Sequence, residues 1–363
     1  MEALNQVLDR VKHEVHQQHP YTVTVPSGDI KVKLNQNENP FDLPSDIRRS
    51  IFDSWNEVEF NRYPTEQPDE LVRSIADYIG WDEKGIIIGN GSNELTYTLG
   101  LVFISQGTKV VLPRPMFSFY QRVVDIYGGQ VVSVAPRDDL GFDTDALMDT
   151  IQTVQPAMVV VTSPNNPTSL AVPFNALRSI ARSTSGLVLI DEAYIEFAHQ
   201  PSMLEVLEDV PNVILLRTFS KAFGLAGTRI GYLIGAPALM SEIMKARVPF
   251  MIDRFSTHVI QTLLSHPKLI QDRIESICSE TRQLTGALKQ MKGIRVIEGQ
   301  ANFVLFQPQG NGQKLFRKLA SMGILVRDMS GYSELKGFLR VSTGTPEQNT
   351  QFIHALTNAM DSF

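Results

Sequence analysis

Short apolar runs that alternate with segments of helical period are the feature that most restricts how this chain can fold. Strands separated by helices form mainly parallel sheets whose two faces are both covered. The pattern therefore predicts an α/β fold with one seven-stranded, mainly parallel sheet. Its predicted strands are Ile86 to Ile88, Lys109 to Leu112, Gln130 to Val134, Ala157 to Val161, Leu187 to Ile190, Val213 to Leu216 and Ile230 to Ile234.

A different sequence pattern follows the predicted strands. After Pro237 the chain is mainly polar and helical in pattern as far as about Met291. Two β-like segments come next, at residues 294–306 and 323–341, with a helical segment between them. This order is typical of a smaller α+β domain. We therefore predict a large domain over residues 36–245 and a small domain over residues 246–363.

The first residues form a separate element. Residues 1–35 are expected to be an N-terminal arm that begins with one amphipathic helix. The arm continues into a loop rich in proline and asparagine. Because the helix is also highly charged, we interpret it as a packing arm and not as a membrane helix. Its apolar face is made by Leu4, Val7, Leu8, Val11 and Val15.

The composition argues against several classes of protein. The 363 residues carry a net charge of −6 without a basic block, so we expect no nucleic-acid partner. No apolar run reaches the length of a membrane span, and the first residues lack a signal-peptide core. The only cysteine, Cys278, cannot form an intrachain disulfide, which is typical of proteins in a reducing cytoplasm. The seven histidines lack metal-ligand spacing, so no metal is expected.

The stretch TFSKAFGLAGTR, Thr218 to Arg229, places a lysine just beyond a predicted strand. Parallel sheets bind ligands at the carboxyl ends of their strands, so we expect Lys221 at a binding crevice. A lysine that is desolvated there, near a second cation, loses part of its preference for the charged form and becomes an amine nucleophile. Schiff-base chemistry is the functional interpretation. A lysine that merely caps the strand end at the surface is the alternative.

A second strand end carries the sequence Gly89-Asn90-Gly91-Ser92-Asn93-Glu94, followed by a helical run. Glycines at a strand-to-helix turn expose backbone N–H groups at the positive end of a helix, which is a site for phosphate. Arg229 adds a guanidinium that can bind phosphate oxygens in bidentate fashion, and Thr218 and Ser220 add hydroxyls. A simple tight turn is the alternative interpretation of the glycines.

Polar side chains follow two further strands. Asp191 leaves a strand that is expected to be buried on both faces, so its charge needs a partner, such as the protonated ring nitrogen of a heterocyclic cofactor. Asn166 and Tyr194 offer an amide and a phenol for a ring oxygen. Taken singly, Asp191 also fits a helix N-cap or turn, and Asn166 a proline-flanked turn. The occurrence of such residues at four strand ends favours a site.

These residues also carry a family resemblance. The blocks GNGSNE, SPNNPT, DEAY, TFSKAFGLAGTRIGY and FLRVSTGT occur in this order over nearly the whole chain, which resembles the fold-type-I pyridoxal-phosphate aminotransferases. LNQNENP at residues 34–40, Arg62-Tyr63-Pro64 and Val326-Arg327-Asp328 are similar to the histidinol-phosphate aminotransferase branch. The resemblance implies a large pyridoxal-phosphate-binding domain and a smaller C-terminal domain.

The resemblance also implies a role for each matching residue. Lys221 forms the internal aldimine, Asp191 pairs with the pyridine nitrogen, and Asn166 and Tyr194 hold the ring oxygen. Phe117 stacks on the ring, and Arg340 binds the substrate carboxylate. The phosphate is held by Ser92, Asn93, Thr218, Ser220, Arg229 and, from the neighbouring subunit of a homodimer, Tyr63.

Substrate residues follow from the same resemblance. Tyr21 and Asn37 match positions near the substrate. Arg327 and Arg340 lie 13 residues apart (340 − 327), a spacing that allows a strand, a turn and a returning strand to bring both to one pocket. Two arginines suit a phosphate or a second carboxylate. The expected reaction is a ping-pong transfer from histidinol phosphate to 2-oxoglutarate. For Arg327, a surface ion pair with Asp328 or Glu334 is the alternative.

Two positions depart from the family pattern. Ser169 follows PNNPT, where glycine is usual, and is expected to affect the loop that carries Asn166. Phe117 stands where tyrosine is frequent, and stacking tolerates this change because it needs only a flat ring.

Other functions remain open from the sequence. An aromatic amino acid aminotransferase is the nearest rival, and a pyridoxal-phosphate decarboxylase of a phosphorylated amino acid would use the same cofactor site. A non-catalytic regulator of the same fold would need a DNA-binding extension, and we expect none in this sequence.

Overall fold

The large sheet of this protein has seven strands, in the order β2-β8-β7-β6-β5-β3-β4. It is seen in a computed structural model that describes residues 2–20, 29–56 and 58–361. The seven strands match the seven predicted runs to within two residues at either end. They are β2 (Ile86–Gly89), β3 (Lys109–Pro113), β4 (Gln130–Val134), β5 (Met158–Thr162), β6 (Leu187–Asp191), β7 (Val213–Thr218) and β8 (Gly231–Ile234).

The pairing of these strands brings their carboxyl ends together. β4, β3, β5, β6 and β7 run parallel to one another, whereas β8 is antiparallel to both β7 and β2. All strands except β8 therefore point the same way. Every residue of β2, β5, β7 and β8 is buried, as expected for strands that are covered on both faces. The predicted mainly parallel sheet is confirmed.

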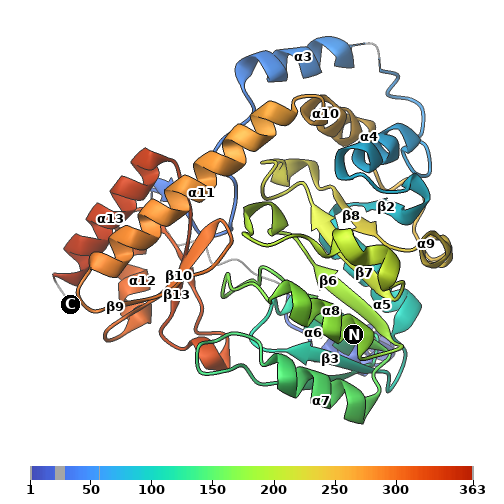
Figure 1. Cartoon of the computed structure of the whole chain (residues 1–363), viewed down its shortest axis with the longest axis horizontal. Helices are drawn as coiled ribbons and strands as arrows, with labels where there is room; N and C mark the ends of the chain where they lie inside the picture. The colour runs from blue at the N-terminus through green and yellow to red at the C-terminus, as the bar shows by residue number, and fades with distance from the viewer. Residues whose placement is uncertain (1, 21–28, 57, 362–363) are drawn as a thin grey trace.

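Helices pack around this sheet, and most of them follow or precede a strand, whereas α10 packs against α3, α4 and α11 (Pro267–Gln290) (Figure 1). α7 shows how the sequence sets their limits. The Asp143 carboxylate caps its first turn by accepting from the Ala146 N–H at 3.0 Å, and Gln155 ends it in the left-handed conformation. The helices are α3 (Ser45–Trp55), α4 (Asp69–Ile79), α5 (Gly91–Phe103), α6 (Phe119–Ile126), α7 (Thr144–Val154), α8 (Phe174–Arg182), α9 (Pro237–Met244) and α10 (Arg254–Leu264).

A smaller α+β part follows, as predicted, and lies to the left in Figure 1. Its antiparallel sheet has the order β12-β13-β10-β9. The strands are β9 (Ile294–Ile297), β10 (Phe303–Pro308), β12 (Arg327–Asp328) and β13 (Leu339–Ser342). The helices are α11 (Pro267–Gln290), α12 (Gly312–Ser321) and α13 (Pro346–Met360).

Two elements tie this part to the rest of the chain. β1 (Val32–Lys33) pairs in parallel with β11 (Ile324–Leu325), so the segment that leads into the large sheet is held by the C-terminal part. The long helix α11 contributes Ile270 to the large core and Leu288 to the smaller one. Short 3-10 turns complete the fold: η1 (Glu83–Gly85), η2 (Ile195–Phe197), η3 (Met203–Asp209), η4 (Ala226–Thr228) and η5 (Ser333–Leu335).

The prediction of one N-terminal amphipathic helix is wrong. Two short helices, α1 (Glu2–Leu8) and α2 (His13–His16), are separated by a turn. Isolated helices of this length are marginally stable unless an apolar face is packed. Here Leu4 and Val7 are each more than 60% exposed, at 61% and 62%, so tertiary packing does not hold one continuous helix together. Arg122 of α6 anchors the end of the arm by donating to the His19 carbonyl at 2.7 Å.

Among the described residues, no helix has both the length and the apolar content needed to cross a bilayer.

Candidate active site

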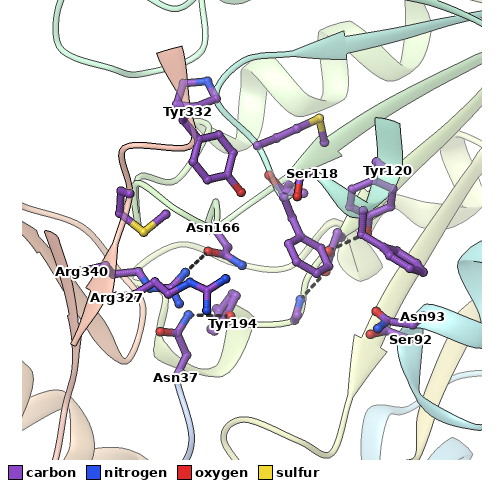
Figure 2. A pocket seen from close by; sticks show the side chains of 18 of the residues that line it. Asn37, Ser92, Asn93, Ser118, Tyr120, Asn166, Tyr194, Arg327, Tyr332 and Arg340 are labelled. Atoms are coloured by element: carbon purple, nitrogen blue, oxygen red, sulfur yellow. Dashed lines mark hydrogen bonds between the residues drawn. The ribbon is translucent and has the colours of Figure 1, made fainter. Parts of the chain in front are cut away.

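A pocket of about 660 Å³ opens at the carboxyl edge of the large sheet, between that sheet and the C-terminal part. It is lined by most of the side chains that the sequence points to: Asn37, Ser92, Asn93, Phe117, Asn166, Asp191, Tyr194, Thr218, Ser220, Lys221, Arg229, Arg327 and Arg340. In Figure 2, Arg327 and Arg340 enter from one side and Ser92 and Asn93 lie on the opposite side. The fold thus collects residues from the ends of β2, β3, β5, β6 and β7 and from β12 and β13 in one cavity.

Lys221 lies in the turn after β7, at the floor of this pocket. Its Nζ donates to the Gln36 carbonyl at 3.2 Å and lies 5.9 Å from the centre of the Tyr194 ring. Burial, together with the nearby positive charges of Arg340 and Arg229, lowers the pKa of the Lys221 amine to about 8, against the opposing effect of the Glu38 and Asp191 carboxylates. A substantial fraction of this amine is therefore neutral near physiological pH, as a nucleophile or base requires.

Asp191 is the last residue of β6 and is held by two donors. Its Oδ2 accepts from the Tyr120 hydroxyl at 2.6 Å, and its Oδ1 accepts from the Ala193 N–H at 2.9 Å. Burial raises the pKa of the Asp191 carboxyl above its usual range, and the two hydrogen bonds oppose that rise. The alternative of a helix N-cap does not apply, since the Ala193 bond closes only a local turn and no α-helix begins there.

Tyr194 and Asn37 form a buried polar pair at the same edge. The Asn37 side-chain amide donates to the Tyr194 hydroxyl at 3.0 Å, and the Asn37 backbone N–H donates to the Ser342 hydroxyl at 2.8 Å. Burial raises the pKa of Tyr194 to about 12. Asn37 itself has φ of 53°, a left-handed conformation that asparagine adopts more readily than most residues. The phenol is therefore held as a neutral donor facing the pocket.

An anion-binding corner is built where α5 begins. The first N–H groups of a helix have no partner within the helix, and the Asn90 side chain does not cap them. A Cβ on Gly91 would lie 2.6 Å from the Arg229 guanidinium, so glycine is what allows arginine to approach the helix start. The Thr218 hydroxyl donates to Ser220 at 3.0 Å, which leaves the Ser220 hydrogen for a ligand.

A similar close approach fixes the neighbouring strand. A Cβ on Gly231 would lie 2.6 Å from the Ser92 backbone nitrogen, so β8 passes directly under the helix start. Arg229 has φ of 56°, a left-handed conformation that is unfavourable for arginine by about 1 kcal/mol. This local strain is expected where a side chain must be aimed at a ligand.

Two arginines meet on the opposite wall. Arg327 of β12 and Arg340 of β13 are direct partners across the antiparallel pair. Arg340 donates to the Asn166 side-chain oxygen and, at 3.3 Å, to the Asn35 carbonyl. Arg327 makes no ion pair with Asp328 or with Glu334, and its guanidinium has no hydrogen-bond partner within the part of the chain that the structure describes. The ion-pair alternative for Arg327 is therefore wrong.

An ion pair that the sequence did not indicate joins two residues that line the pocket. Arg114, just after β3, approaches Glu334 of η5 to 2.9 Å. The two residues are 220 positions apart (334 − 114), so nothing local announces the contact. The pair links the large sheet to the C-terminal part beside Tyr332, which also lines the pocket (Figure 2).

Tyr120 is a second residue that sequence reasoning missed. Its position three residues after Phe117, at the start of a helix, was the available signal, since such spacing puts both side chains on one face. The two rings meet edge to face at 6.4 Å and 87°. Phe117 lines the pocket, and its ring also stacks with Phe119 at 5.8 Å.

Two predicted residues lie elsewhere. Tyr63 does not line the pocket; its side chain is 81% exposed and its ring contacts Phe250 at 5.2 Å. Tyr21 falls outside the residues that the structure describes.

Ser169 leaves the loop of Asn166 in place. It has φ of 60°, which explains why glycine suits this position, and its side chain is fully buried. Gly299 makes the room, because a Cβ there would lie 1.8 Å from the Ser169 hydroxyl oxygen. The serine hydroxyl donates to the Thr168 carbonyl at 2.6 Å. Asn166 still reaches the pocket, so the expected disturbance of its loop is not seen.

Metal ligands do not gather in this pocket or elsewhere in residues 2–20, 29–56 and 58–361: no three His, Cys, Asp or Glu side chains lie close enough together to hold an ion.

Solved structures share this fold. A histidinol-phosphate aminotransferase from Sinorhizobium meliloti, in complex with pyridoxal 5′-phosphate, superposes with a TM-score of 0.87 over 97% of this chain and 98% of its own, at 23% identity. A Thermus thermophilus aspartate aminotransferase variant superposes with a TM-score of 0.79 over 96% of this chain and 99% of its own, at 19% identity. At such identities the likeness concerns the fold.

Sequence relatives are more similar. The histidinol-phosphate aminotransferase of Chlorobium phaeovibrioides is 39% identical over 90% of both chains. That of Chlorobaculum tepidum is 36% identical over 93% of this chain and 97% of its own. The family model for aminotransferase class I and II matches residues 29–356. The chain therefore belongs to the class I and II aminotransferase family.

Proposed function

We propose that this protein transfers the amino group of histidinol phosphate to 2-oxoglutarate, with pyridoxal 5′-phosphate as its cofactor. The observation that carries the proposal is the pair of cross-strand arginines, Arg327 and Arg340, in the same pocket as Lys221. Two guanidiniums suit a substrate that carries a phosphate or a second carboxylate. The names of the sequence relatives support the same amino donor.

The donors on the sheet side fit a phosphorylated pyridine. The start of α5, Arg229 and the Ser220 hydroxyl form a cradle for a dianion, and an added Cβ at Gly91 would fill it. Asp191 would hold the ring nitrogen, and Phe117 would cover one face of the ring. Asn166 and Tyr194 would hold the ring oxygen. Ser92, Asn93 and Thr218 complete the proposed phosphate site.

When bound, pyridoxal phosphate supplies an electron sink for the electron pair left on the substrate α-carbon. Asp191 supports this by holding the proton on the ring nitrogen. At roughly 4 Å and an effective dielectric near 20, such an ion pair attracts by about 4 kcal/mol.

Lys221 carries the covalent attachment and the proton transfer. With a pKa of about 8, about a tenth of the amine is neutral at pH 7, against fewer than about one in a thousand for an ordinary lysine. The neutral Nζ is the base that takes the proton from the substrate α-carbon.

The arginines select the substrate. Arg340 binds the carboxylate of 2-oxoglutarate, and Arg327 reads the phosphate of the amino donor or the second carboxylate of the acceptor. Asn37 and Tyr21 are proposed to contact the substrate as well. Because both substrates use the same pocket in turn, we expect ping-pong kinetics. The ion pair between Arg114 and Glu334 joins the two walls of the pocket beside the proposed substrate.

A coupled assay of glutamate formation tests this function. Histidinol phosphate, phenylalanine and threonine phosphate are compared as amino donors to 2-oxoglutarate. Histidinol phosphate is expected to give the highest kcat/KM. A preference for phenylalanine would make the protein an aromatic amino acid aminotransferase. Release of carbon dioxide from threonine phosphate without glutamate would make it a decarboxylase, an activity named for a Porphyromonas gingivalis protein of the same fold with a TM-score of 0.78.

A homodimer completes the proposal. Phe60 and Tyr63 are 80% and 81% exposed, and they lie beside Trp55 and Phe250. Exposed aromatic side chains gathered in this way are typical of protein–protein surfaces. We propose that Tyr63 reaches the cofactor phosphate of a second copy, which would explain its distance from the pocket of its own chain. Sedimentation that found a fully active monomer at nanomolar concentration would contradict this.

We also place the protein in the cytoplasm. Its only cysteine, Cys278, is a free thiol, which is typical of chains from a reducing compartment. Fractionation of the source cells with an antibody to the protein tests this location.

A further inference from the structure

We propose that Tyr120 is a positioning residue that fixes the Asp191 carboxylate in place and keeps it ionised for the ring nitrogen of the cofactor. This inference rests on the function proposed above, because it gives Asp191 a cofactor to hold. It concerns a residue whose phenol lies behind the carboxylate and not among the groups proposed to touch the cofactor.

The contact is short and well enclosed. The Tyr120 hydroxyl donates to Asp191 Oδ2 at 2.6 Å, and the tyrosine side chain is only 3% exposed. The other carboxylate oxygen accepts from the Ala193 N–H at 2.9 Å. Each oxygen of an ionised carboxylate accepts about two hydrogen bonds, so both keep capacity for a partner in the pocket. Two donors on two oxygens prevent rotation of the carboxylate.

The same tyrosine also contacts other parts of the proposed cofactor site. Its ring meets Phe117 edge to face. The Thr96 side chain lies near the phenol and opposes the rise of the Tyr120 pKa, and the Thr96 hydroxyl donates to the Ser92 carbonyl at 2.9 Å. Tyr120 therefore contacts both the carboxylate and the aromatic ring that are proposed to hold the cofactor. It lies on the same side of the pocket as Ser92 and Asn93 (Figure 2).

The charges around Asp191 show what this contact opposes. Burial is the largest influence and raises the pKa of the carboxyl, and the neighbouring Glu192 adds to that rise. The Tyr120 hydrogen bond is the largest influence in the opposite direction, ahead of the Ala193 N–H and the Lys221 charge. Tyr194 also faces the carboxylate, but its own pKa of about 12 keeps it neutral. Without the Tyr120 hydroxyl, the Asp191 carboxyl would take up a proton at higher pH.

Tyr120→Phe tests the inference because it removes the hydroxyl and keeps the ring. The dissociation constant of pyridoxal 5′-phosphate is measured by dialysis of the holoenzyme between about pH 6 and 8. Loss of a hydrogen bond to the charged form raises the pKa of Asp191, so affinity should fall about tenfold at pH 6 and by much less at pH 8. Tyr127→Phe is the matched control. It also removes a tyrosine hydroxyl, at the C-terminal end of α6, but that hydroxyl donates to the Tyr97 carbonyl and not to Asp191.

The double variant Tyr120→Phe, Asp191→Asn separates positioning from packing. In the Asp191→Asn background, loss of the hydroxyl should change cofactor affinity less than about twofold and without pH dependence. An equal loss in both backgrounds, or a loss in wild type that does not depend on pH, would overturn the inference. Failure of the wild-type protein to bind pyridoxal phosphate would instead overturn the proposed function.

Discussion

The sheet side of the pocket and the C-terminal side hold charge in different ways. On the sheet side, Lys221 and Asp191 are enclosed. Burial lowers the pKa of the Lys221 amine and raises the pKa of the Asp191 carboxyl, so it favours the neutral form of each group. On the C-terminal side, Arg327 is half-buried and lacks a hydrogen-bond or ion-pair partner among the described residues. A guanidinium stays charged in almost any surroundings. We infer from this difference that one wall is suited to proton transfer and the other to recognition of fixed charge.

Removal of the lysine is the strongest test of this division. Lys221→Ala should abolish transamination and covalent attachment of the cofactor, because no other lysine lines the pocket. Mass spectrometry after borohydride treatment measures the attachment. Lys245→Ala, which removes an exposed lysine paired with Glu242, is the control. A Lys221→Ala protein that still carried a borohydride-stable adduct would show that another residue is the attachment point.

Asp191→Asn tests the second buried group and should have the next largest effect. The amide keeps the shape but not the charge, so the cofactor should still bind while turnover falls about 10²- to 10⁴-fold. Single-turnover kinetics measure the slowed proton transfer. Asp139→Asn, at an exposed carboxylate that pairs with Arg137, is the control. Turnover within a few-fold of wild type would remove Asp191 from the proton-transfer wall.

Arg327→Ala tests the recognition wall. A hydrogen bond to a charged group contributes about 1.5–3 kcal/mol, so KM for histidinol phosphate should rise about 10- to 100-fold. KM for phenylalanine should change little, because that donor has no phosphate. Steady-state kinetics with both donors measure the difference. Arg137→Ala removes an exposed arginine that does not line the pocket and serves as control. Equal losses for the two donors would mean that Arg327 does not read the phosphate.

The pH dependence of attachment should show the smallest effect. Only a neutral amine attacks an aldehyde, and the Lys221 amine has a pKa of about 8. The rate at which cofactor-free protein takes up pyridoxal should therefore rise about fivefold from pH 7 to pH 8, reach about tenfold near pH 9 and level off above that. Stopped-flow absorbance follows the reaction. A rate that keeps rising to pH 10, as for an exposed lysine, would show that the pocket does not shift the amine.

Residues at strand ends could be predicted from the sequence. The apolar runs before Asp191 and Lys221 fix where β6 and β7 end, and parallel strands put those ends at one edge. The family resemblance then gave each residue a role, which stays a prediction. The strand-turn-strand spacing of Arg327 and Arg340 placed them correctly on one wall, since a local hairpin decides their register.

Contacts between distant segments could not be predicted. Tyr120 meets Asp191 across 71 positions, and Asn37 meets Tyr194 across 157. Such pairs depend on how helices and loops pack against the sheet in the folded protein, and local sequence patterns do not predict that packing. The N-terminal helix failed for the opposite reason. Its helical periodicity is present in the sequence, but a short helix needs an apolar face that packs against other residues. The Val7 side chain is largely exposed and does not provide such a contact with the described residues.

The segment from Asn35 to Asn37 has a consequence for how substrates compete. The Gln36 carbonyl already accepts a hydrogen bond from Lys221, and the Asn35 carbonyl accepts one from Arg340. An incoming anion therefore replaces a neutral carbonyl as the hydrogen-bond acceptor. Each new bond is charge-assisted and roughly twice as strong as the bond it replaces, so the anion gains only the difference between the two. A ligand with one weak charge gains little from this exchange. A ligand that also reaches Arg327 would gain a contact at a side chain that has no partner among the described residues, so we expect the pocket to bind doubly charged substrates in preference to small singly charged anions.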